Sequence, residues 1–65
     1  MGYIVYILVE YNDRGQPVMM KRPDGGVYLF YDGLLSEKVA RAFQRGGRNV
    51  GVISFDLRAE IPNFN

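Results

Sequence analysis

The most hydrophobic stretch of the chain runs from Tyr3 to Tyr11 and carries apolar or aromatic side chains at eight of its nine positions. β-Branched and aromatic residues dominate it, which favours a strand over a helix. Both alternating sets of side chains are apolar, and Glu10 is the one charged residue. A strand with two apolar faces is typical of the middle of a sheet that is covered on both sides.

Two further strands are predicted after a tight reversal at 12–15, where Asn and Asp precede a glycine. The second strand, 18–22, is short and of mixed polarity. The turn at 23–25 has the order Pro-Asp-Gly, which suits a β-turn and separates the second strand from a third at 27–31. Consecutive strands joined by tight turns pair antiparallel, so we expect a three-stranded β-meander.

A helix is predicted over residues 37–45, with Ser36 as its N-cap and the glycine pair 46–47 as its end. At 100° per residue, Val39 and Phe43 lie at the centre of one face. The helix is therefore expected to bury this face against the sheet.

Residues 49–58 return to a strand-like pattern. A right-handed crossover through the helix would make this fourth strand parallel to the third, and in a meander also parallel to the first. The predicted fold is a single α+β domain over 1–65 with the order β-β-β-α-β. Its four-stranded mixed sheet has the order 4-1-2-3, with strand 4 parallel to strand 1 and one helix on one face. Residues 59–65 are expected to form an irregular tail.

The chain is short, with 65 residues, and contains neither cysteine nor histidine. A domain of this size buries only about 60% of the surface of its unfolded chain. Disulfides are impossible, and a structural zinc site lacks its two preferred ligand types. Oligomerisation is the remaining common way to add stability. The lack of cysteine is compatible with a reducing compartment.

The formal net charge is +1, which excludes a strong global attraction to nucleic acid or to acidic membranes. No segment has the roughly 18 apolar residues that a membrane span needs. The first apolar run lacks a basic leader and a small-residue cleavage site, which disfavours a signal peptide. We expect a complete cytoplasmic protein without a cofactor or bound metal.

One short helix covers only one face of a four-stranded sheet, so the other apolar face needs a cover. We expect that face to meet the same face of a second copy in a homodimer, because large exposed apolar patches mark interfaces. The alternative is that the tail covers it through Ile61 and Phe64. The aromatic residues assigned to this dimer or partner face are Tyr3, Tyr6, Tyr11, Tyr28, Phe30 and Tyr31.

A basic stripe follows the predicted helix, at Lys38, Arg41, Arg45 and Arg48. No acidic residue interrupts it, and the first three positions fall on the side away from the apolar face. Such a row can follow a phosphate backbone or an acidic protein surface. It is equally typical of the solvated side of an amphipathic helix. A third hypothesis, base stacking on the sheet aromatics, is disfavoured by the scarcity of lysine and arginine on the strands.

Catalysis has little support in the sequence, because Ser–His and Cys–His pairs cannot exist in it. A meander, a helix and a parallel strand also form the first half of the RNase H-like arrangement, whose enzymes gather carboxylates around Mg²⁺. Glu10, Glu37 and Asp56 would be the comparable residues, but this is an analogy of strand order alone. The glycine pairs fit turns and a helix end, not a phosphate-binding loop.

These observations favour a non-enzymatic binding or regulatory protein that acts through a surface and forms a homodimer. An inhibitor or adaptor of a larger macromolecule, of the kind encoded by mobile elements or viruses, is one version. The alternative is a nucleic-acid-binding protein that uses the basic stripe.

Overall fold

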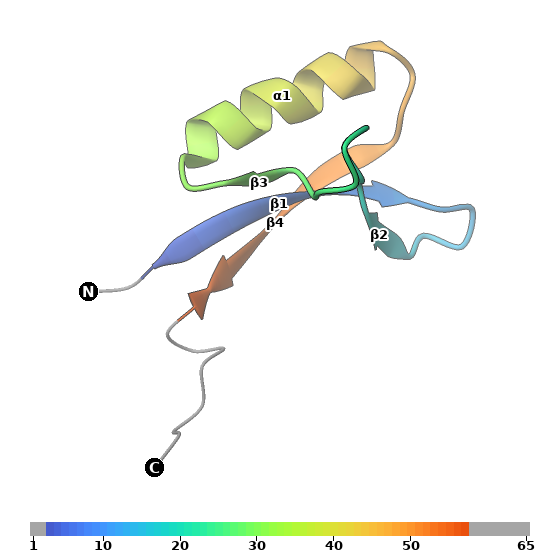
Figure 1. Ribbon diagram of the computed structural model, residues 1–65. Coiled ribbons are helices and arrows are strands. Elements are labelled where there is room, and N and C mark those ends of the chain that lie inside the picture. Colours follow the sequence, from blue (N-terminus) through green and yellow to red (C-terminus); the bar gives the residue numbers. More distant parts are fainter. Residues whose placement is uncertain (1–2, 58–65) are drawn as a thin grey trace.

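The computed structural model describes residues 3–57 and contains one helix and one four-stranded sheet (Figure 1). The predicted α+β class is confirmed. The elements are β1 (Ile4–Tyr11), β2 (Pro17–Met19), β3 (Leu29–Phe30), α1 (Gly33–Arg45) and β4 (Val50–Asp56). The predicted tail at 59–65, with Ile61 and Phe64, lies outside the described residues.

The strand β1 lies at the centre of the sheet, as its two apolar faces predict. Along one edge it pairs antiparallel with β4, from Ile4↔Asp56 to Glu10↔Val50. Along its other edge it pairs antiparallel with both β2 and β3. The sheet is therefore three strands wide, because β2 and β3 follow one another along the same edge of β1.

Leu8 marks the junction between β2 and β3. Its carbonyl oxygen accepts a hydrogen bond from the Met20 N–H (3.1 Å), and its own N–H donates to the Tyr28 carbonyl oxygen (3.1 Å). Between these two residues the chain leaves the edge as a small hairpin, residues 21–27, closed by an antiparallel bridge between Lys21 and Val27. In Figure 1 this hairpin rises on the same side of the sheet as α1.

The predicted strand order and direction are corrected by this pairing. Because β3 pairs with β1 and not with β2, the sheet is not a meander of order 4-1-2-3. Strand β4 is antiparallel to β1, not parallel. The expected parallel relation of β3 and β4 is confirmed, since both are antiparallel to the strand between them. The error arose in placing the third strand parallel to the first.

Helix α1 begins four residues earlier than predicted. Its N-cap is Asp32, whose Oδ1 accepts hydrogen bonds from the backbone N–H groups of Leu34 (3.0 Å) and Leu35 (3.4 Å). Ser36, the predicted cap, lies inside the helix, fully buried, with its Oγ donating to the Gly33 carbonyl oxygen (2.7 Å). Asp32, a good capping residue that the prediction did not consider, starts the helix one turn earlier.

The predicted end of the helix is confirmed. The α1 helix ends at Arg45, and Gly47 takes a positive φ of 90°, a conformation that favours glycine. From there the chain reaches β4, so α1 spans the connection between two parallel strands.

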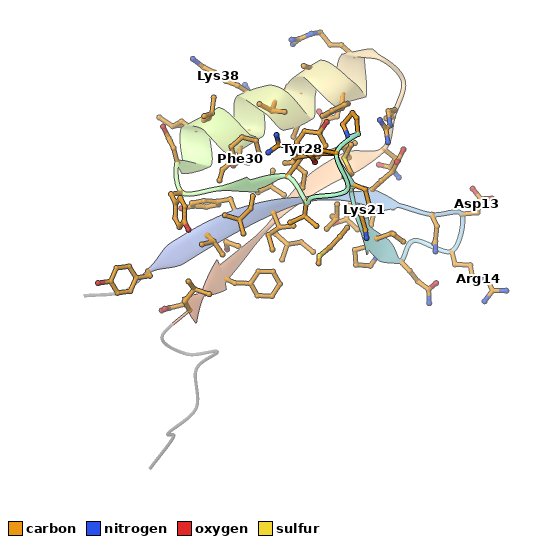
Figure 2. The ribbon with its side chains drawn as sticks, in the orientation of Figure 1. Asp13, Arg14, Lys21, Tyr28, Phe30 and Lys38 are labelled. Atoms are coloured by element: carbon orange, nitrogen blue, oxygen red, sulfur yellow. The ribbon has the colours of Figure 1, made fainter. Side chains whose placement is uncertain are left out.

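The hydrophobic core lies between α1 and one face of the sheet. Figure 2 shows Tyr28 and Phe30 in this space, and the Tyr28 ring meets the Phe43 ring edge to face at 5.5 Å. Predicted core residues Val39 and Phe43 are partly buried there. The complete cluster has Leu8, Met20, Ala40 and Val50 as buried members, with Tyr28, Phe30, Val39, Phe43 and Val52 packed against them.

Candidate binding surfaces

The face of the sheet opposite α1 is uncharged and mostly apolar in the described residues. Leu8 points into the core beneath α1, so the odd-numbered residues of β1 point the other way. Residues directly opposite them on neighbouring strands share that face. We call this surface the open face; it comprises Tyr3, Val5, Ile7, Val9, Tyr11, Pro17, Met19, Leu29, Gly51, Ile53 and Phe55. None of these side chains carries a charge.

Some residues on the middle strand of the open face are buried, whereas residues around them are exposed. Val5 and Val9 are each only 3% exposed. By contrast, Tyr3 is 65% exposed, Met19 47% and Phe55 37%. The surface left accessible is on the order of a few hundred Å². A continuous apolar patch of this size on a small protein is a candidate interface.

The six aromatic residues predicted for one face do not share it. Tyr3 and Tyr11 lie on the open face. Tyr28 and Phe30 pack into the core, and Tyr6 lies on the α1 side, where its ring closely approaches Gly33. Tyr31 follows β3 and is 78% exposed. Aliphatic residues such as Leu29 and Ile53, which the prediction left out, form much of the open face.

Three of the four predicted basic-stripe residues lie on the outer side of α1. Ser36 and Ala40 are buried on the inner side, which directs Lys38, Arg41 and Arg45 outward. Figure 2 shows Lys38 projecting away from the sheet. Arg41 forms an ion pair with Glu37 one turn earlier in the helix. This pair is weak, because Arg41 Nη2 lies 3.8 Å from Glu37 Oε1 and both side chains are largely exposed.

Arg48 does not join this row. Its guanidinium makes two hydrogen bonds to Glu10, Nε to Oε2 at 3.1 Å and Nη2 to Oε1 at 2.6 Å, and lies 5.1 Å from the centre of the Phe43 ring. These hydrogen bonds lower the pKa of Glu10 and raise the pKa of Arg48. Arg48 thus ties the loop after α1 to the end of β1.

A hollow of about 330 Å³ lies between α1 and β4. Its lining consists of Glu37, Ala40, Arg41, Gln44, Gly51 and Val52. At its side, Gln44 Nε2 donates a 2.8 Å hydrogen bond to the Val50 carbonyl oxygen. We call this feature the β4 hollow. The β4 hollow could not be predicted from the sequence, because it depends on how one side of the helix lies beside β4.

A second hollow, of about 540 Å³, lies beside the end of β1. Lys21 and the Glu10–Arg48 pair contribute its charged groups. The Glu10 carboxylate and the Arg48 guanidinium already form an ion pair with one another. Neither group is therefore free to bind a ligand in this hollow.

The acidic residues compared with a Mg²⁺ site do not form one in the part of the chain that the structure describes. No three Asp or Glu side chains among residues 3–57 come close enough together to hold a metal ion. The antiparallel direction of β4 also removes the analogy of strand order that suggested Glu10, Glu37 and Asp56. Within the same residues no helix is long and apolar enough to cross a membrane.

Comparison of the chain with protein-family models, with curated proteins and with solved structures gives no significant match. The functional interpretation therefore depends on the surfaces themselves.

Proposed function

We propose that this chain is a non-enzymatic binding or regulatory protein that acts as a homodimer through its open face. The observation that carries the proposal is the continuous, uncharged and apolar surface opposite α1. Its exposed members, led by Tyr3, Met19 and Phe55, have no layer over them among residues 3–57.

The lack of charge on the open face supports its use in a twofold interface. In such an interface the same patch is used by both copies, so a charged residue near the axis would meet its own copy. A face without charges avoids that repulsion. A standard interface buries roughly 800 Å² on each partner, which would cover the open face.

The small hydrophobic core provides a thermodynamic argument for dimerisation. The buried hydrophobic residues of the described chain are few: Val5, Leu8, Val9, Met20, Ala40 and Val50. A domain with so little buried apolar surface gains stability when a second copy covers more of it.

A dimer of this kind leaves the outer side of α1 available for a larger macromolecule. We therefore propose a role as an inhibitor or adaptor, of the kind that mobile elements or viruses encode, acting in the cytoplasm. The lack of cysteine is compatible with a reducing compartment, and the role is proposed from small size and from the exclusion of other classes.

Sedimentation equilibrium tests the dimer with a matched pair of variants. Met19 and Val18 are neighbours with similar exposure, 47% and 54%, but Met19 lies on the open face and Val18 on the α1 side. At about 10 to 100 µM, the wild type and Val18→Glu should sediment at twice 7.4 kDa. Met19→Glu should sediment as a monomer. A wild type that stays monomeric throughout this range contradicts the proposal.

A second candidate function is nucleic-acid binding, and the outward direction of Lys38, Arg41 and Arg45 supports it. With Arg48 held by Glu10, three cations of the basic stripe remain to contact phosphates, so binding should be weak and salt-dependent. A gel shift at low salt that disappears in the Arg41→Glu, Arg45→Glu double variant would support it. No shift at low salt would remove it.

A further inference from the structure

The outer edge of β4 can be assigned from the hydrogen bonds on its inner edge. Tyr11 N–H donates to the Asn49 carbonyl oxygen (2.9 Å), and Leu57 N–H donates to the Tyr3 carbonyl oxygen (2.7 Å). With the pairing between these ends, the odd-numbered residues of β4 direct their N–H and C=O groups toward β1. The even-numbered residues direct theirs away from the sheet.

Two residues in the middle of this edge have unpaired backbone groups. No strand among residues 3–57 pairs with the outer side of β4, and no hydrogen bond joins the outward N–H and C=O groups of Val52 or Ser54 to another described residue. The Val50 carbonyl oxygen, one rung earlier, is bonded to the Gln44 side chain. Two adjacent outward-facing residues thus offer two donors and two acceptors, the pattern of a sheet edge that can accept a further strand.

The β4 hollow lies beside this same edge. Val52 lines the hollow and also belongs to the edge, and Gln44 both lines the hollow and bonds the Val50 carbonyl oxygen. A strand laid along β4 would direct every second side chain toward α1, where the hollow provides about 330 Å³. Backbone groups and a side-chain site therefore occur together.

We propose that the outer edge of β4 binds an extended segment of another protein as an added strand. This inference rests on the proposed role as a binding protein and names the class of partner. Main-chain hydrogen bonds to Val52 and Ser54 would supply affinity, and the β4 hollow would supply selectivity, as in other cases of strand addition.

The two faces of the added strand define the chemistry of the segment. Side chains toward α1 would lie near Glu37 and Arg41, which favours polar groups able to hydrogen-bond with either. Side chains on the other face would extend the open face beside Ile53 and Phe55, which favours apolar groups. The partner segment should alternate polar and apolar residues over about five positions.

The test uses the full chain and a display library of random 12-residue peptides. Peptides selected on the wild type should alternate polar and apolar residues. Their affinity, measured by fluorescence anisotropy, should be unchanged in Ser54→Ala and reduced about tenfold in Ser54→Pro, because proline removes one outward donor and blocks the edge. The inner hydrogen bonds to β1 do not involve the Ser54 N–H, so this variant should remain a dimer by sedimentation.

Amide hydrogen exchange of the wild type provides a reading that does not depend on any variant folding. In the free protein, the amides of Val52 and Ser54 should exchange at least about tenfold faster than those of Ile53 and Phe55, which are bonded to β1. A selected peptide should slow the two fast amides.

Three results would overturn the inference. One is that no peptide is enriched. Another is that selected peptides lose affinity in Met19→Glu but not in Ser54→Pro, which would place them on the open face. The third is slow exchange of Val52 and Ser54 in the free protein, which would mean that residues 58–65 or a second copy already occupy the edge. Sedimentation of the wild type separates each of these from failure of the dimer itself.

Discussion

The two faces of this sheet have similar residue types and different surroundings. On the α1 side, Leu8 is fully buried and is surrounded by side chains from α1, β3 and β4 and by Met20, which follows β2. On the open face, the adjacent Ile7 lies opposite Leu29 and Ile53, and no described element lies above it. Hydrophobicity alone therefore does not tell which face of a central strand becomes the core of the monomer.

The open face nevertheless buries its own centre. Val5 and Val9 are almost inaccessible because larger side chains on the flanking strands and along β1 itself surround them, as Phe55 does beside Val5 and Met19 beside Val9. A single layer can thus protect its middle strand while its outer strands stay exposed. The exposed remainder is what a second copy would cover.

The largest effect that separates the two faces is expected from a pair of truncations. Leu8→Ala should lower the free energy of unfolding by about 2–5 kcal/mol, because it leaves a cavity in a fully packed site. Ile7→Ala should cost the monomer less, because Ile7 is only partly buried. Urea titrations at several protein concentrations measure both.

The concentration dependence sharpens the same comparison. If the open face forms the dimer, the stability of the wild type should rise with protein concentration and that of Ile7→Ala should rise less. Equal losses for the two truncations at low concentration would show that the faces are energetically alike, against our interpretation.

A smaller effect is expected from the cap of the helix that covers the α1 face. Asp32→Ala removes the acceptor for two N–H groups at the start of α1 and should cost about 1 kcal/mol. Asp32→Asn keeps a capping oxygen and serves as the control. Thermal unfolding followed by circular dichroism would measure the difference, and an unchanged midpoint for Asp32→Ala would mean that the first turn contributes little.

The smallest effect concerns pH and the ion pair at the end of β1. Since Arg48 lowers the pKa of Glu10, the pair stabilises the fold above the ordinary carboxyl pKa of 4.5, and this contribution is lost as the pH falls through the lowered value. An NMR titration should place the Glu10 midpoint below 4.5 in the wild type and nearer to it in Arg48→Gln. Identical midpoints in the two proteins would show that the pair has no effect in solution.

Local features of the fold were predictable from the sequence, and pairing between distant segments was not. The turn at 23–25 forms as expected, with the Gly25 N–H donating to the Arg22 carbonyl oxygen at 2.9 Å. What the local pattern does not encode is that the strand after this turn returns to β1. One incorrect pairing then reversed the expected direction of β4 relative to β1.

From the sequence, the candidate site could be predicted only as an apolar sheet face that the single helix does not cover. The sequence shows that one helix is too little for two apolar faces, and this follows from residue type alone. Assigning Tyr28 and Phe30 to a face required the register of β3, which depends on a contact with β1. The outer edge of β4 required in addition the hydrogen-bond pattern on its inner side, which no residue type reveals.

The hairpin at 21–27 has a consequence for how this protein could change in length. Met20 and Tyr28 both bond to Leu8, so the chain departs from and rejoins the edge of β1 at one rung, eight positions apart. Because both residues face Leu8, the strand resumes with the same side chains facing the core. The hairpin is thus a natural insertion point, where a segment can be shortened, lengthened or exchanged without turning a single residue of the sheet over.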